Sequence, residues 1–379
     1  MDGSDALERH LSATCRRVRE EVLRLVGEGD VEALLLGGGY GRGEGGVLRT
    51  AEGDKPYNDL EYYVLTRTPR LLSERKWREP LHELGERLSP DAGLEVEFKV
   101  LDFRALRAGA VTMFTYDLAM GHRWVVGEES MLAGCEHLRN AAGIPAHEAT
   151  RLLFNRCSGL LFSAERLSRG TFGPEESDFV GRNLAKVQLA LGDALLALRR
   201  AYHWSCRERH ARLEALRDAG LPAWFQEVLN HHSQGVDFKL HPVRVTDSRE
   251  RLAARHRELS GLAMKVWLWS ESSRLGRAFA SARDYALDPG NKCPEQPVWR
   301  NALVNARAFG LGAAFGSGGF RYPREGLFRA LALLLWEPAT FTDPALAGAV
   351  RVSLRCGPGG SADLAGSVQA YERIWRRFN

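Results

Sequence analysis

Two acidic residues, Asp59 and Glu61, stand one residue apart at the start of a hydrophobic segment. Because successive side chains of a strand point to opposite faces, we expect both acids on one face, with Leu60 and Tyr62 on the other. Two carboxylates held close together repel each other unless a cation neutralises them. The pair therefore predicts a site for a divalent metal ion, which prefers oxygen ligands.

A glycine-rich segment, residues 37–46, precedes these acids and follows a hydrophobic run at 31–36. Such a turn leaves backbone N–H groups free to surround a phosphate. It lacks the Gly-Lys-Ser/Thr ending of a P-loop, and the Asp-Leu-Glu that follows does not fit a dinucleotide fold. By itself the cluster is also compatible with a tight turn. Beside two metal-binding carboxylates, it predicts phosphoryl or nucleotidyl transfer.

Hydrophobic periodicity predicts the elements that position these residues. Strict alternation over residues 94–101 indicates a strand on which Glu95, Glu97 and Lys99 share one face. Helices are expected at 5–27 and 71–88, and further strands at 31–36, 60–65 and 123–126. This order gives a small domain with a mixed sheet.

From about residue 146 the pattern becomes helical, with segments at 148–167, 178–202 and 252–275 and turn-rich breaks that include 233–242. We therefore predict an α+β protein. It has a small mixed-sheet domain at residues 1–142 and an all-α domain at residues 143–379.

The two motifs together resemble the signature of the DNA polymerase beta nucleotidyltransferase superfamily. That signature is an apolar strand, Gly-Ser or Gly-Gly, a short helix, and then Asp-hydrophobic-Asp/Glu. The matching residues are Gly38-Gly39-Tyr40-Gly41-Arg42-Gly43 and Asn58-Asp59-Leu60-Glu61. Two features depart from it: Gly39 replaces the commoner serine, and the stretch before Asp59 is lengthened by an insertion around 47–55.

The resemblance implies the metal ligands. Asp59 and Glu61 would hold magnesium in a site for two ions, and a later strand would add a third carboxylate. Glu97 is the best match and Glu95 its competitor. Glu97 would complete a metal site or take a proton from the acceptor, unless it belongs to a solvated strand face.

The resemblance also implies the nucleotide contacts. Gly38, Gly39 and Arg42 come from the glycine-rich segment. In relatives that modify small molecules, a lysine and then a tyrosine on the next helix approach the nucleotide; here these are Lys186 and Tyr202. An exposed helix lysine and a core aromatic are the alternatives, and a straight helix would place Tyr202 opposite Lys186.

The predicted activity is Mg²⁺-dependent transfer of a nucleoside monophosphate from an NTP, with ATP expected, to a hydroxyl of a small-molecule acceptor. Pyrophosphate is released. The alternatives are an acceptor on a protein or RNA, or a non-catalytic nucleotide-binding or antitoxin-like module.

Composition agrees with an ordinary globular protein of 379 residues, 44% of them hydrophobic. The net charge of only +4 gives no reason to expect nucleic acid as a partner. Six scattered cysteines form no Cys-x-x-Cys pair, which argues against a zinc site or a disulfide framework. There is no signal-peptide pattern and no membrane-length apolar run, so a cytoplasmic protein without a membrane partner is expected.

Overall fold

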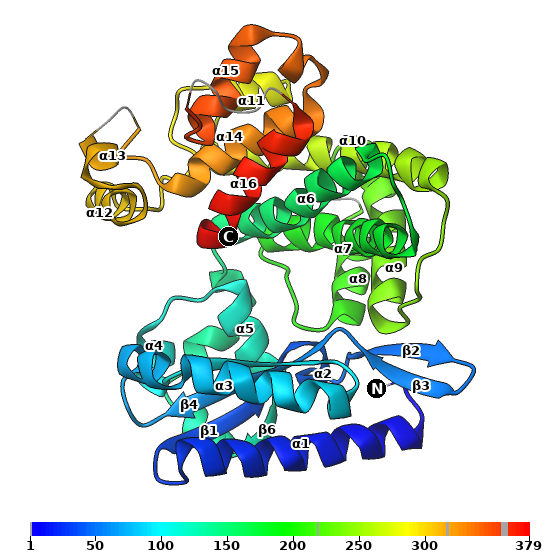
Figure 1. The fold of residues 1–379 in the computed structure, drawn as a ribbon, viewed down its shortest axis with the longest axis vertical. Coiled ribbons are helices and arrows are strands. Elements are labelled where there is room, and N and C mark those ends of the chain that lie inside the picture. The colour runs from blue at the N-terminus through cyan, green and yellow to red at the C-terminus, as the bar shows by residue number, and fades with distance from the viewer. Residues whose placement is uncertain (1, 218–219, 316–317, 358–362) are drawn as a thin grey trace. The chain divides into compact units, whose positions relative to one another are not determined.

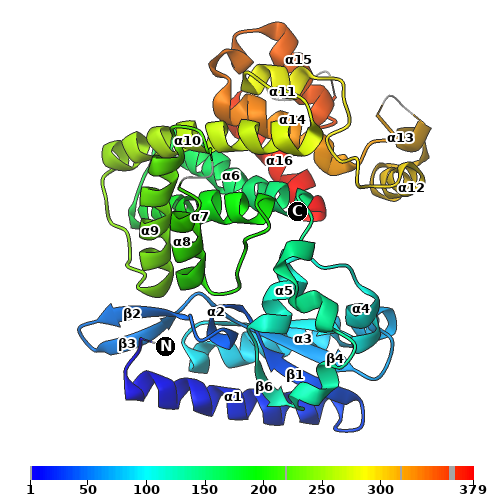
Figure 2. The same cartoon turned by 180° about the vertical axis from the view of Figure 1, so that it is seen from behind.

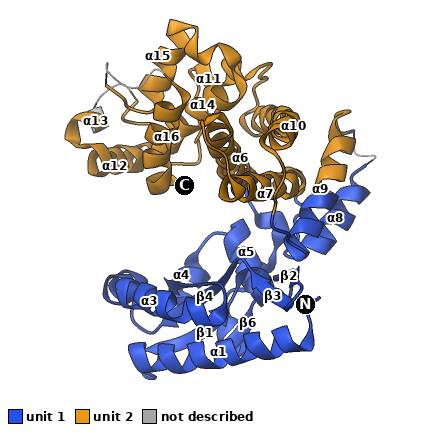
Figure 3. Cartoon of the chain, turned by 45° about the vertical axis from the view of Figure 1, so that its right-hand side comes forward, with its two compact units in different colours: residues 1–145, 199–220, 233–244 blue, residues 146–198, 221–232, 245–379 orange. Residues whose placement is uncertain are grey.

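The computed structural model describes residues 2–217, 220–315, 318–357 and 363–379. The chain forms two compact units (Figures 1 and 3). Unit 1 comprises residues 1–145, 199–220 and 233–244, and unit 2 comprises residues 146–198, 221–232 and 245–379. The prediction of an α+β protein is confirmed. The first boundary lies at 145/146, and two later segments return to unit 1.

Unit 1 is built on a four-stranded sheet in the order β5-β4-β1-β6. Strand β1 is antiparallel to both β4 and β6, whereas β4 and β5 are parallel and are joined through helix α3. A parallel pair needs such a crossover, because a hairpin can join only antiparallel strands. All four strands lie where the sequence predicts them: β1 Val31–Leu36, β4 Asp59–Thr66, β5 Glu95–Leu101 and β6 Arg123–Val126.

Each face of this sheet is covered by a separate hydrophobic core. One face, which includes Leu60 and Tyr62, packs against helices α1 and α3. The other face, which includes Tyr63 and Leu65, packs against α4, α5 and the short helices after β6. Helix α1 is the long helix at the lower edge of unit 1 in Figures 1 and 2. The helices are α1 Asp5–Val26, α3 Arg70–Ala92, α4 Phe103–Ala108, α5 Met113–Met120, η1 Glu129–Leu132, η2 Glu136–Arg139 and η3 Ala141–Gly143.

The stretch between the glycines and Asp59, predicted only as an insertion, folds into a β-hairpin. Strand β2 Gly46–Thr50 pairs antiparallel with β3 Gly53–Tyr57. Its charged residues and Pro56 break the apolar alternation by which strands are recognised. At its end, Asn58 adopts a left-handed backbone conformation with φ 76°, which asparagine tolerates better than most residues, and this turn leads into β4.

The described part of unit 2 is helical and contains no strand, as predicted for the second domain. Helix α7, Pro174–Leu198, ends before Tyr202, so the prediction of a helix that continues through Tyr202 is wrong. Arg200 has a φ of 59°, which a continuing right-handed helix does not allow. The predicted break at 233–242 is also wrong at its start, because helix α9 runs to Leu240.

The remaining helices of the chain begin with α6. They are α6 His147–Ser168, α7 Pro174–Leu198, α8 Cys206–Ala215, α9 Phe225–Leu240, α10 Arg249–Leu275, α11 Ala282–Leu287, α12 Val298–Phe309, α13 Leu311–Phe315, α14 Pro323–Trp336, η4 Pro338–Phe341, α15 Pro344–Ser353 and α16 Leu364–Phe378. Helix α8 belongs to unit 1, and α9 begins in unit 2 and ends in unit 1. No helix in the described ranges is long and apolar enough to cross a membrane.

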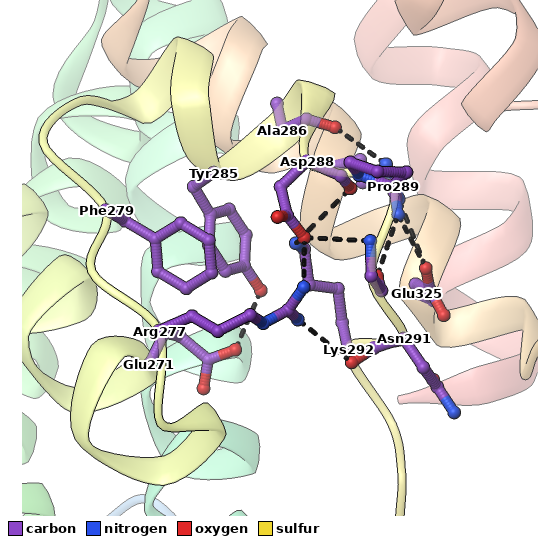
Figure 4. Close-up of polar contacts among 12 residues, drawn as sticks. Glu271, Arg277, Phe279, Tyr285, Ala286, Asp288, Pro289, Asn291, Lys292 and Glu325 are labelled. Carbon is purple, nitrogen blue, oxygen red and sulfur yellow. Dashed lines mark hydrogen bonds and ion pairs between the residues drawn. The ribbon is translucent and has the colours of Figure 1, made fainter.

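Unit 2 contains a fully buried lysine, Lys292, beside the rings of Phe279 and Tyr285, which contact each other (Figure 4). Its ammonium lies 4.8 Å from each ring centroid and donates to Asp288 Oδ1 at 2.6 Å. Arg277 binds the same oxygen at 2.6 Å. Burial lowers the pKa of Lys292, and Asp288 opposes that shift. The carboxylate of Asp288 therefore compensates a charge that has no access to water.

We expect Asp288→Ala to destabilise unit 2 by about 3 kcal/mol, because a buried ion that loses its partner retains its desolvation cost. The additional change Lys292→Met should restore most of this loss, since it removes the stranded charge. Differential scanning calorimetry of the full chain measures both variants. Equal unfolding temperatures for Asp288→Ala and the wild type would contradict this account.

Candidate functional site

The register of β4 and β5 brings the predicted acids together. Asp59 and Glu61 share one face of β4, and Glu97 on β5 lies directly beside Glu61. Glu95 lies beside Asp59 but is exposed to solvent, whereas Glu97 is half-buried. We call Asp59, Glu61 and Glu97 the acidic cluster.

The acids of this cluster repel one another. Burial raises the pKa of Asp59, and the charges of Glu61 and Glu97 raise it further, with Lys99 opposing them. Glu95 is not among the main contributors to this shift. Of the two candidates for the third carboxylate, Glu97 is therefore the one coupled to Asp59.

Two donors hold the carboxylates of Glu61 and Glu97. The Tyr63 hydroxyl donates to Glu61 Oε2 at 2.5 Å. The Lys99 ammonium lies 3.7 Å from the same oxygen and 3.4 Å from Glu97 Oε2. Within the described residues, no three histidine, cysteine, aspartate or glutamate side chains are arranged so that they could hold a metal ion. The carboxylate oxygens of the acidic cluster suit a divalent metal ion. In this structure, however, the carboxylates of Glu61 and Glu97 contact Tyr63 and Lys99.

The glycine-rich segment turns tightly against the acidic cluster. Its residues Gly38–Gly41 form the one-turn helix α2, whose first N–H groups have no acceptor within the helix. Gly38 has a φ of 58°, and a Cβ atom there would lie 3.2 Å from the Glu61 carboxyl carbon. Only glycine combines this conformation with so close an approach. The backbone at Gly38 therefore lies beside a predicted metal ligand.

The departure at Gly39 has a structural reason. A Cβ atom at this position would lie 3.1 Å from the backbone oxygen of Glu44, because the loop folds back with Glu44 N–H donating to Gly39 O. A serine would press on that oxygen. The loop therefore has glycine rather than serine at position 39 because its backbone folds back closely at Glu44.

Glu44 joins the glycine-rich loop to the segment at 199–220. Its carboxylate accepts from the Ser205 hydroxyl at 2.6 Å and from the Cys206 N–H at 2.9 Å, at the start of helix α8. Burial alone would raise the pKa of Glu44, but these hydrogen bonds outweigh it and the net shift is downward. Glu44 therefore fixes the end of the glycine-rich loop against the start of helix α8.

Arg42 is held by a chain of polar contacts. Its guanidinium lies 3.3 Å from Asp117 Oδ2 on α5, and the Tyr202 hydroxyl donates to the same oxygen at 3.3 Å. Arg209 donates in turn to the Tyr202 oxygen at 3.2 Å. Tyr202 is only 3% exposed, so it occupies the position of a buried aromatic, the alternative considered for it.

A lysine that the sequence did not single out lies near this chain of contacts. Lys239 is at the end of α9, and its backbone oxygen would lie 3.1 Å from a Cβ atom built on Gly46. Burial lowers the pKa of Lys239 and repulsion by Arg42 lowers it further, with a smaller contribution from Arg209, while Cys206 and Glu44 oppose the shift. No side chain in the described ranges forms an ion pair with its ammonium. We call Arg42, Arg209 and Lys239 the basic cluster.

Sequence reasoning missed Lys239 because it took 233–242 for a break, and no motif marks this residue. Lys186, the predicted nucleotide-binding lysine, lies on the exposed side of α7 in unit 2. Gly38, Gly39, Arg42, Asp59, Glu61, Glu97 and Tyr202 all lie in unit 1. The roles given to these residues in nucleotide and metal binding remain predictions.

No protein-family model matches the chain, and a search of curated proteins found none with significant sequence similarity. The function must therefore be argued from the site.

Asp59→Asn should stabilise the metal-free protein at pH 7. The folded state raises the pKa of Asp59, so its ionisation costs folding free energy at every pH above that raised value. The gain should shrink as the pH falls and vanish below about 4, where both states are protonated. Urea unfolding of both proteins between pH 4 and 8 measures this difference. A variant less stable than the wild type at pH 7 would contradict the repulsion.

Glu44→Gln should show the opposite pH dependence. The folded state lowers the pKa of Glu44, so its carboxylate contributes stability above the unfolded-state pKa of about 4.3. That stability is lost as the pH falls through the lower, folded-state pKa. We expect a deficit of about 1–2 kcal/mol at pH 7 that disappears in acid, measured by urea unfolding in a series extended down to about pH 2. A deficit that does not change with pH would mean that shape rather than charge matters here.

Proposed function

We propose that this protein is a metal-dependent nucleotidyltransferase that transfers a nucleoside monophosphate from an NTP to an acceptor hydroxyl. One observation carries the proposal: Asp59, Glu61 and Glu97 lie on adjacent strands beside the glycine-rich turn. An acidic cluster next to a backbone that can bind phosphate suits a substrate carrying both a metal ion and phosphates.

The acidic cluster fits Mg²⁺ in the chemistry of its donors. Carboxylate oxygens are the ligands that this ion prefers, and burial together with the charges of Glu61 and Glu97 raises the pKa of Asp59. Asp59 and Glu61 are the proposed ligands, with Glu97 as the third, in a site for two ions. When bound, the metal supplies positive charge that neutralises the reacting phosphate.

The basic cluster fits the remaining phosphates. Burial and the guanidiniums of Arg42 and Arg209 lower the pKa of the Lys239 ammonium. A phosphate bound beside it would supply negative charge and would raise that pKa again. Arg42 is oriented by Asp117, which Tyr202 and Arg209 support, so Tyr202 acts through Arg42 in this proposal. The N–H groups of Gly38 and Gly39 would bind phosphate oxygens.

In the proposed reaction, the acceptor oxygen attacks the alpha-phosphorus of the NTP. The new oxygen–phosphorus bond forms as the bond to the beta-phosphate bridging oxygen breaks, and pyrophosphate leaves. The proton of the acceptor passes to Glu97 or to water. With ATP the product is an adenylylated acceptor. The modest net charge favours a small molecule over RNA as the acceptor.

The direct test incubates the purified chain with each NTP, Mg²⁺ and a panel of hydroxyl-bearing metabolites, and measures pyrophosphate release. We expect release with at least one acceptor. Asp59→Asn and Glu61→Gln should each lower the rate by about 100-fold or more, because each removes a carboxylate that would hold the metal ion, whose positive charge stabilises the reacting phosphate.

Undiminished release in the Asp59→Asn, Glu61→Gln double variant would refute the proposal. Labelling of proteins or RNA with a tagged ATP, without labelling of any metabolite, would assign a macromolecular acceptor. NTP binding without any transfer would favour a non-catalytic module.

Lys239→Met should weaken NTP binding by about 10- to 100-fold, the usual effect of losing a hydrogen bond to a charged group. Lys186→Met is the matched variant, because it removes the same charge from the exposed lysine on α7. Titration with a fluorescent ATP analogue compares the two. A large loss of affinity in Lys186→Met, without a loss in Lys239→Met, would assign the phosphate contact to Lys186, as the sequence suggested.

A further inference from the structure

Lys99 occupies a particular position in the acidic cluster. It follows Glu97 by two residues on β5, so both side chains lie on the same face of the sheet. Its ammonium is 3.4 Å from Glu97 Oε2 and 3.7 Å from Glu61 Oε2. One ammonium thus connects carboxylates of two neighbouring strands.

The oxygen of Glu61 that faces Lys99 is also the acceptor of the Tyr63 hydroxyl, at 2.5 Å. The lone pairs of this oxygen are therefore turned toward two donors within the protein. The Lys99 ammonium also lies 5.9 Å from the centre of the Tyr63 ring. Tyr63 and Lys99 together define how the Glu61 carboxylate is oriented.

The contribution of Lys99 to the fold is small by comparison. Its side chain is 49% exposed, and an ion pair in such a position stabilises a protein little. Three carboxylates and one ammonium also leave the group with an excess of negative charge. Lys99 neutralises the acidic cluster in part, and within the described residues no three histidine, cysteine, aspartate or glutamate side chains are arranged to hold a metal ion.

We propose that Lys99 is a resident counter-ion that competes with the divalent metal for Glu61 and Glu97. This inference rests on the metal site of the proposed function and adds a residue to it. In the metal-free protein the ammonium holds both carboxylates. A divalent ion binds only when Lys99 withdraws from them, so the lysine weakens the affinity for metal and keeps the empty site ordered.

The test measures Mn²⁺ binding to the full chain without nucleotide, from the electron paramagnetic resonance signal of the free ion. We expect Lys99→Met to bind Mn²⁺ at least about fivefold more tightly than the wild type, given the energy of two unit charges at this separation. Lys99→Arg keeps a cation that pairs well with carboxylates and should not tighten binding. The combined change Lys99→Met, Glu97→Gln should remove the gain, because the gain depends on Glu97.

Lys55→Met is the control for a general change in charge. Lys55 pairs with Glu52 on the β2–β3 hairpin and is 55% exposed, so its loss should leave the Mn²⁺ affinity unchanged. An equal gain in Lys55→Met would overturn the inference, because the effect would then be a long-range field. Equal affinities of the wild type and Lys99→Met would overturn it while leaving the metal site intact. Absence of Mn²⁺ binding in every variant would refute the metal site itself together with the inference.

Discussion

The repulsion among Asp59, Glu61 and Glu97 is the constraint on which the candidate site of unit 1 depends. Parallel pairing of β4 and β5 fixes Glu97 beside Glu61, and alternation along β4 fixes Asp59 on the same face. Two hydrophobic cores hold the sheet, so the acids cannot move apart by bending it. Only the cation that neutralises the acids can change, and in this structure the ammonium of Lys99 neutralises them in part.

The glycine-rich loop brings its backbone close to the negative charge of the acidic cluster. Gly38 approaches the Glu61 carboxyl without a side chain in between, and Glu44 ties the other end of the loop to α8. The same loop carries Arg42, which Asp117 orients. Unit 1 therefore holds a group of excess negative charge and a group of cations around one turn, which is the distribution that a metal-bound polyphosphate would complement.

Residues far apart in the sequence supply the second group. Arg209 lies on α8 and Lys239 on α9, and both belong to segments that return to unit 1 after the chain has entered unit 2. Buried contacts make this return specific: Ser205 and Cys206 hold Glu44, and Tyr202 holds Asp117. Packing of these segments against the loop creates an environment in which the ammonium of Lys239 is disfavoured.

The sequence by itself determined the four strands of the main sheet, the shared face of Asp59 and Glu61, and the shared face of Glu95, Glu97 and Lys99, because alternation is a local property. It could not determine that β5 lies parallel to β4 in the register that places Glu97 beside Glu61 and Glu95 beside Asp59. Nor could it locate Lys239 beside Arg42 or end α7 before Tyr202, because these depend on which distant segments pack together. Periodicity describes one element at a time, whereas charge interactions depend on distances that only the tertiary structure sets.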